Sequence, residues 1–189
     1  SAYNSKFYDL SLWQANFKQD LATVNSPVKI PTHKVNNLIG ANRFTNGKFD
    51  GNANGLMFYA SSGSATATWD NSNKLGSGGS VKLTSAKPSF MIINIGAVDA
   101  SKKYILPFSA IANKEANITA FLRQFNSPHA TISPISTIKV QNTANTYECL
   151  FSFPTTEANT CITFGSGNDD LAYWLDNIEF YEADVADTK

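Results

Sequence analysis

Residues 103–125 read KYILPFSAIANKEANITAFLRQF, which is two apolar segments joined by a polar turn. In the first segment, alternate positions from Tyr104 to Ala110 are apolar, and the second segment repeats this period from Ile118 to Leu122. A period of two is typical of a β-strand that lies with one face against a core. The stretch therefore predicts two neighbouring strands of an antiparallel sheet.

Short segments of the same kind fill the chain from Leu38 onward, and Gly, Asn, Ser and Pro clusters separate them. No segment after residue 40 shows helical periodicity. About ten short strands with turns between them predict an all-β fold, either an antiparallel β-sandwich or a barrel. The other segments are GLMFYAS (55–61), ATATW (65–69), SVKLTS (80–85), FMIINIGAV (90–98), STIKVQ (136–141), YECLFSFP (147–154), NTCITFGS (159–166) and AYWLDNIEFYE (172–182).

The composition narrows the classes of partner. The 15 basic and 15 acidic residues give no net charge, so nothing in the balance favours binding to nucleic acid. Charged residues make up only 16% of the 189 residues, and such a polar but uncharged composition is more typical of secreted β-proteins. The sequence has no apolar run near the ~18 residues that a membrane helix requires.

The length suits one domain with a substantial core. We expect an irregular lead-in segment over residues 1–35, a β-sandwich over 36–183 and a linker or tail over 184–189. The only cysteines, Cys149 and Cys161, lie in adjacent apolar segments. They are either a cross-strand disulfide of an exported protein or two reduced core residues.

Residues that would indicate catalysis are scarce. The sequence has no G-x-S-x-G motif, and its two histidines, His33 and His129, each lie in a segment flanked by proline. Asp169 and Asp170 are adjacent and point apart, whereas glycoside hydrolysis requires two carboxylates across a cleft. The sequence therefore predicts that this chain is not itself an enzyme.

An acid in the last apolar segment is unexpected. Residues 173–180 read YWLDNIEF, which has the content of a buried strand apart from Asp176 and Asn177. Burying a carboxylate without a partner is costly, and Asp and Asn are poor strand formers. Asp176 therefore either takes part in a metal site or caps a turn through backbone N–H groups.

Four stretches together carry the pattern of a known family. They are NLIGANRFTNGKFDG (37–51), GGSVKLTS (78–85), IGAVDASKKYILPFSAIANKEANITAFLRQ (95–124) and YWLDNIEF (173–180). In this order they resemble the jelly-roll carbohydrate-binding modules of the family 4, 9, 16 and 22 type. The resemblance implies a two-sheet antiparallel jelly roll that binds a polysaccharide or oligosaccharide without catalysis. It also implies attachment to a catalytic domain of the same chain, a glycoside hydrolase or polysaccharide lyase, secreted by or displayed on a bacterial cell.

The resemblance also implies a structural calcium ion. The positions that match the family's acids are Asp50, Asp70 and Asp176, and we expect the backbone carbonyls of Lys48 and Asn73 to join them. Oxygen donors from several strands are what Ca²⁺ prefers.

The sugar-binding surface is predicted from the strand faces. If Ile118 and Leu122 face the core, then Phe121, Arg123 and Phe125 face outward and offer aromatic faces and a guanidinium to a sugar ring. In the opposite arrangement the aromatics are buried. By the same parity we place Phe90, Ile92 and Tyr173 outward, with Trp69 and Trp174 as alternative contacts.

The beginning of the chain resembles a different kind of protein. FYDLSLWQANFKQDLATVNSP (7–27) is similar to the region that follows the last coils of right-handed parallel β-helix enzymes acting on polysaccharides. This likeness leaves a second function open: a structural or interdomain module that binds no sugar, with Tyr8, Trp13 and Phe17 covered by the parent enzyme.

Overall fold

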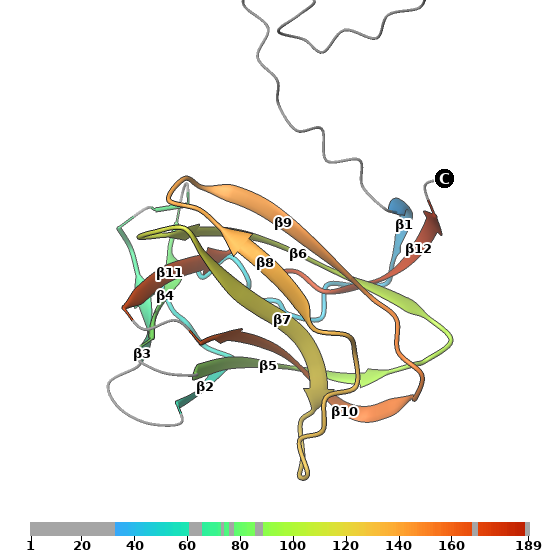
Figure 1. Ribbon diagram of the computed structural model, residues 1–189. Coiled ribbons are helices and arrows are strands. Elements are labelled where there is room, and N and C mark those ends of the chain that lie inside the picture. The colour runs from blue at the N-terminus through green and yellow to red at the C-terminus, as the bar shows by residue number, and fades with distance from the viewer. Residues whose placement is uncertain are drawn as a thin grey trace, which may run out of the picture. The chain divides into compact units, whose positions relative to one another are not determined.

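The structure is a computed structural model that describes residues 33–60, 66–72, 74–75, 78–85, 89–167 and 170–187. Within these ranges the chain forms twelve strands and no helix (Figure 1). The compact unit spans Lys34–Ala186. None of the described residues belongs to a helix that could cross a membrane.

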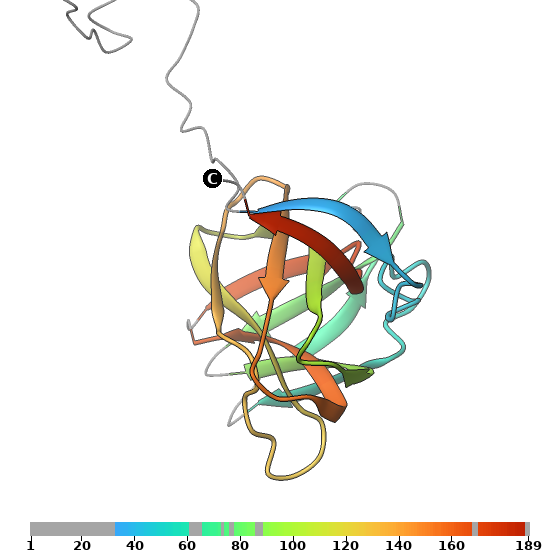
Figure 2. The same ribbon diagram turned by 90° about the vertical axis from the view of Figure 1, so that its right-hand side faces the viewer.

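The strands form two sheets that pack face to face (Figures 1 and 2). The five-stranded sheet has the order β2 (Leu56–Ala60), β5 (Ser89–Val98), β10 (Glu157–Ser166), β7 (Ala116–Gln124), β8 (Ser136–Val140). The seven-stranded sheet has the order β1 (His33–Ile39), β12 (Tyr181–Asp187), β6 (Lys103–Ala112), β11 (Leu171–Asp176), β4 (Ser80–Ser85), β3 (Thr66–Asp70), and β9 (Asn145–Phe151) also pairs with β6.

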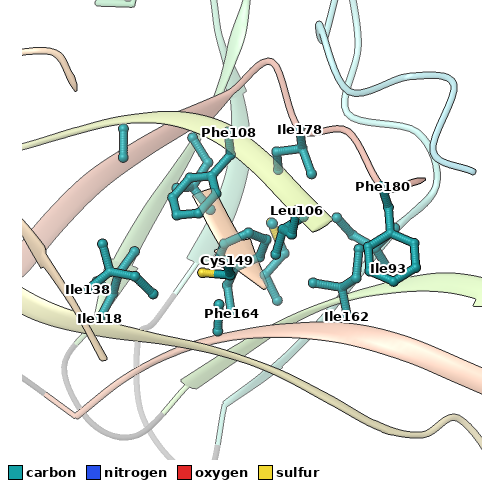
Figure 3. Close-up of a cluster of buried hydrophobic side chains, with 14 of the residues drawn as sticks. Ile93, Leu106, Phe108, Ile118, Ile138, Cys149, Ile162, Phe164, Ile178 and Phe180 are labelled. Carbon is teal, nitrogen blue, oxygen red and sulfur yellow. The ribbon is translucent and has the colours of Figure 1, made fainter. Parts of the chain in front are cut away.

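The core lies between the two sheets and confirms the predicted all-β sandwich (Figure 3). Leu106 and Phe108 point from β6 toward Ile162 and Phe164 of β10, and the rings of Phe108 and Phe164 meet edge to face at 5.1 Å. Burial of each such side chain contributes about 1.5–3 kcal/mol. Ile118, Ala120 and Leu122 of β7 also belong to this core, which confirms the face assigned to them.

The sandwich is slightly longer than predicted. β1 begins at His33, and β12 continues to Asp187, so residues 184–187 are strand and not a tail. The polar composition of these residues does not indicate a strand, because it is pairing with the neighbouring strand β1 that makes them one. Asn36 of β1 also donates a hydrogen bond to the Asp184 carboxylate at 3.4 Å. The lead-in predicted over residues 1–35 lies outside the described residues up to residue 32.

The cysteines do not pair in this structure. Cys149 and Cys161 are both buried and free, and they lie on different sheets. Cys149 faces the core, where burial raises the pKa of its thiol to about 11.

The corner that follows β11 contacts the turn around Gly47, which lies much earlier in the chain. Asn177 has a φ of 50°, which breaks the two-residue alternation, so that Ile178 and Phe180 still reach the core. The Ile178 amide donates to the Gly47 carbonyl at 3.0 Å, and the Phe180 amide donates to the Asn42 side chain at 2.9 Å. The turn around Gly47 and this corner are thereby held against each other.

We predict that Gly47→Ala strongly destabilises the fold. A Cβ at this position would lie 1.8 Å from the Ile178 carbonyl oxygen, so the turn and the corner would have to separate. Loss of the contact and of its hydrogen bond should lower the free energy of unfolding by about 3 kcal/mol, measured by urea denaturation. Gly167→Ala is the control, because a Cβ there meets nothing within 4 Å, and equal effects of the two substitutions would contradict this reading.

Candidate functional site

The outer face of the five-stranded sheet carries the predicted aromatic surface. Strand register brings side chains from four strands into rows that cross the sheet. One row runs Met57, Ile92, Thr163, Phe121, and its neighbour runs Tyr59, Phe90, Gly165, Thr119. A third row places Arg123 beside Cys161 and Asn94.

A groove of about 430 Å³ lies on this face. Its sides come from the edge strand β2, from β5 and β7, and from the loop after β7, so it extends across the strands. The described residues that line it are Met57, Tyr59, Ile92, Arg123, Phe125 and His129. A concave site that combines aromatic and apolar side chains with a few polar groups is the usual form of a small-ligand site.

Phe121 lies on the same outer face but is not among the described residues that line the groove. It does face outward as predicted, but only 7% of its surface is exposed, because Phe90 packs edge-on against it at 6.3 Å. Gly165 between them makes room, since a Cβ there would lie 3.0 Å from the Phe90 ring and 2.8 Å from the Thr119 hydroxyl. Phe121 therefore offers little surface to a ligand.

The accessible aromatic surface comes from β2 and from the β7–β8 loop. Tyr59 and Met57 are 58% and 42% exposed. Sequence reasoning did not select them, although Leu56 and Phe58 alternate with them and pack on the core. In the loop, His129 has a φ of 59° and its amide donates to the Asn126 carbonyl at 2.9 Å, which orders the turn beside Phe125.

Arg123 is half-buried in the groove and its side chain makes few interactions. Its guanidinium carbon lies 5.9 Å from the centre of the Phe90 ring, within the range of a cation–π contact. Its Nε is buried without a hydrogen-bond partner, and the described residues provide no ion pair for it. Buried donors are nearly always satisfied, so this group is well placed to meet a ligand.

Two of the predicted sugar contacts lie elsewhere. Tyr173 is fully buried in the core. Ile178 and Phe180 also point into the core, because the positive φ of Asn177 changes the face of the strand after β11 has ended. Burial raises the pKa of the Tyr173 phenol. Trp69 lies on β3 of the other sheet, and its indole donates to the Phe49 carbonyl at 2.8 Å.

The other predicted site gathers around Asp176, which is 3% exposed. Its carboxylate accepts from the Asn177 amide at 2.7 Å, and the Asn177 side chain lies 3.3 Å from its second oxygen. Burial raises the pKa of Asp176 to about 6, the Asn177 amide opposes this, and the negative charge of Asp50 adds to it. The structure thus brings Asp50 and Asp176 close enough to repel each other.

Lys48 and Gly78 complete the surroundings of these two acids. Gly78 has a φ of 92°, and a Cβ there would lie 2.5 Å from the Asp50 carboxylate and 3.9 Å from the Lys48 carbonyl oxygen. Phe49 and Asn177, next to the two acids, both have positive φ, at 47° and 50°. Such backbone strain is kept where the surroundings impose it, and the oxygen donors here fit a hard cation such as Ca²⁺.

Asp70 does not join this pair. Its carboxylate accepts from the Trp174 indole and from the Ser72 amide, and these bonds outweigh the effect of burial and lower its pKa. The described residues contain no group of three His, Cys, Asp or Glu side chains arranged to hold a metal. Asn73, the other predicted carbonyl ligand, lies outside the described residues.

Solved structures of other proteins share this architecture. No protein-family model and no curated protein matches the sequence. The CBM22-1 xylan-binding domain of Paenibacillus barcinonensis Xyn10C is similar in structure, with a TM-score of 0.59 and 10% identity over 79% of this chain and 99% of that one. The family 11 carbohydrate-binding module of Clostridium thermocellum, in complex with a β-1,3-1,4-mixed-linked tetrasaccharide, has a TM-score of 0.53 and 12% identity over 70% of this chain and 91% of that one.

A third similar structure belongs to a longer protein. The enzymatically active domain of bacteriophage CBA120 tailspike protein 4 has a TM-score of 0.59 and 18% identity over 75% of this chain. Only 21% of that chain is covered. At these identities the likeness concerns the fold alone, which is a two-sheet β-sandwich that the three structures share with this chain.

We predict that Asp176 makes the metal-free protein less stable as pH rises from about 4 to about 6. Its folded pKa is about 6 against 3.8 for the ordinary value, so the folded state holds a proton that the unfolded state has lost. This contribution is present below pH 4 and is lost as pH rises to 6, by on the order of 3 kcal/mol at about 1.4 kcal/mol for each pH unit.

The measurement is the difference in unfolding free energy between the parent protein and Asp176→Asn, taken from urea denaturation with chelator across this pH range. Carboxylates that do not interact with Asp176 contribute equally to both proteins, so the difference reports Asp176 together with its repulsion by Asp50. Asp170→Asn, just before β11, is the control, because that exposed acid should leave the pH profile unchanged and its φ of 57° is one that Asn adopts. Parallel curves for the parent protein and Asp176→Asn would show that Asp176 is not responsible.

Proposed function

We propose that this domain is a noncatalytic carbohydrate-binding module and that its ligand occupies the groove on the five-stranded sheet. The observation that carries the proposal is the combination of exposed Tyr59 and half-buried Phe125 with Arg123, whose guanidinium has no ion pair among the described residues, in one groove. The fold, which is shared with proteins described as carbohydrate-binding modules, supports it.

The groove has both kinds of group that sugar recognition needs. A pyranose ring presents a face of C–H bonds, which packs on aromatic rings, and a rim of hydroxyls, which hydrogen-bond to polar side chains. Tyr59 and Phe125 supply the rings, and the Tyr59 hydroxyl, Arg123 and His129 supply the polar groups. Because Arg123 already packs against Phe90, whose ring meets that of Phe121, binding loses little side-chain entropy there.

The groove favours binding over hydrolysis. Its described lining residues include no carboxylate, whereas glycoside hydrolysis typically requires a pair of them. We propose that the module directs an appended polysaccharide-degrading enzyme to its glycan outside a bacterial cell. An α-L-arabinofuranosidase structure of which this chain covers 26% supports such an arrangement, at a TM-score of 0.59 and 11% identity.

A structural or interdomain module is the second candidate. It is favoured by the tailspike protein, where the matched region is about a fifth (21%) of a longer chain. Under this hypothesis the isolated domain binds no glycan and its removal destabilises the parent. The aromatic residues suggested for such docking, Tyr8, Trp13 and Phe17, lie outside the described residues.

We also propose that Asp50, Asp176 and the Lys48 carbonyl hold a structural calcium ion. A dication would remove the repulsion between the two acids and the cost of burying Asp176. It would also join the Gly47 turn to the corner at Asn177 at the point where the backbone already connects them. The ion is a structural one and takes no part in the groove.

We predict that Tyr59→Ala and Phe125→Ala each weaken polysaccharide binding by about tenfold or more, since each loses a stacking face worth about 1–2 kcal/mol. Affinity electrophoresis against a panel of soluble polysaccharides, followed by calorimetry, measures this. Leu38→Ala removes an equally exposed apolar residue (50%) from the other sheet and should have no effect. Retention of the parent protein by no polysaccharide in the panel would favour the structural module instead.

We predict that calcium raises the melting temperature of the metal-free protein by several degrees. A ligand at a hundredfold excess over its dissociation constant stabilises the folded state by about 2.7 kcal/mol. Asp50→Asn and Asp176→Asn should each abolish most of the shift. Asp70→Asn should keep it, because the Asp70 carboxylate is bound to Trp174 instead. A melt that does not respond to calcium or chelator would remove this proposal.

A further inference from the structure

The charges of the groove have one sign. Its described lining residues include two that can carry positive charge, Arg123 and His129, and none that can carry negative charge. Grooves for neutral sugars hydrogen-bond hydroxyls through donors and acceptors alike, and side-chain amides and carboxylates are the usual acceptors. Here the described lining has only the Tyr59 hydroxyl and the His129 ring as side-chain acceptors.

An acid that contacts the residue next to Arg123 is already engaged. Glu157, at the start of β10, accepts from the Gln124 side chain at 2.8 Å and from the Asn159 amide at 3.1 Å. The hydrogen bond from Gln124, followed by the one from the Asn159 amide, lowers the pKa of Glu157. The two carboxylate oxygens are therefore already engaged by these groups. Arg123 is left without an ion pair among the described residues, and its Nε is buried without a partner.

Arg123 is also held in position. Its guanidinium lies 5.9 Å from the Phe90 ring centre, and Phe90 in turn packs on Phe121. A planar guanidinium held over a ring presents a fixed fork of donors, which matches the two oxygens of a carboxylate. Because Arg123 is half-buried, such a pair gains more than an exposed surface ion pair would.

We infer that the groove selects an anionic glycan, with the carboxylate of a uronate residue on Arg123 and the sugar ring on Tyr59 or Phe125. This inference rests on the proposed function of the same groove. His129 is exposed in the loop that follows β7 and adds a second hydrogen-bond donor for the anionic glycan. A sulfated sugar shares the negative charge but lacks the planar pair of oxygens.

The test uses matched probes. Calorimetry is run with hexamers of galacturonate, mannuronate and guluronate, with the methyl ester of each, with xylohexaose and with a sulfated galactan oligosaccharide. We expect at least one uronate to bind about tenfold or more tightly than its methyl ester, because esterification removes the charge and keeps the ring. We also expect the preference to shrink as salt is raised.

The variants connect the preference to Arg123. Arg123→Gln should weaken binding of the selected uronate by about tenfold or more and weaken binding of the ester much less, and Arg123→Lys, which keeps the charge without the fork, should fall between the parent protein and Arg123→Gln for the uronate. Lys82→Gln removes one charge from the opposite sheet and should match the parent protein. Thermal melts of every variant establish that it is folded.

Each other outcome overturns the inference in a distinguishable way. Equal or tighter binding of xylohexaose or of the esters would overturn the uronate assignment and leave the carbohydrate-binding function standing. Binding of the sulfated galactan alone would overturn the carboxylate assignment. Binding of no probe, together with no retention by the wider polysaccharide panel, would remove the proposed function and this inference with it.

Discussion

The contact on which the rest of the sandwich depends joins the Gly47 turn to the corner after β11. Ile178 donates to the Gly47 carbonyl there, and the absence of a side chain at Gly47 is what allows the approach. The contact lets Ile178 and Phe180 fill the core between the sheets and places Asp50 beside Asp176. One close backbone approach therefore sets the core, the strained residues and the candidate cation site together.

Much of this could be predicted from the sequence because the strand period is local. The alternation in β7 correctly placed Ile118, Ala120 and Leu122 inside, and the resemblance brought Asp50 and Asp176 to one place. Tyr173 was placed on the wrong face by counting back from Ile178 and Phe180, because the positive φ of Asn177 changes the face between them and counting along the chain does not reveal it. Asp70 was expected among the calcium ligands, but its carboxylate accepts from the indole of Trp174, which lies 104 residues later in the chain.

The sequence predicted only part of the candidate groove, because it does not show how much of a side chain its neighbours cover. Parity tells which face a side chain lies on, but not how much of it a neighbour covers. Phe121 and Phe90 lie on the predicted face and cover each other, whereas Tyr59 and Met57 stay exposed because β2 is the edge of its sheet. Edge position and mutual coverage are properties of the assembled sheet, so they appear only once the strand order is known.

The pairing of β1 with β12 has a mechanical consequence. These two strands are neighbours at one end of the seven-stranded sheet and run in opposite directions, so the described chain enters and leaves at the same edge (Figure 2). If the start of β1 and the end of β12 were pulled apart, the force would act on the hydrogen bonds between the two strands one after another. The pair would therefore unzip and would not have to shear many hydrogen bonds at once. We therefore expect the sandwich to yield to force first at this edge, while the groove on the opposite sheet stays intact under the same load.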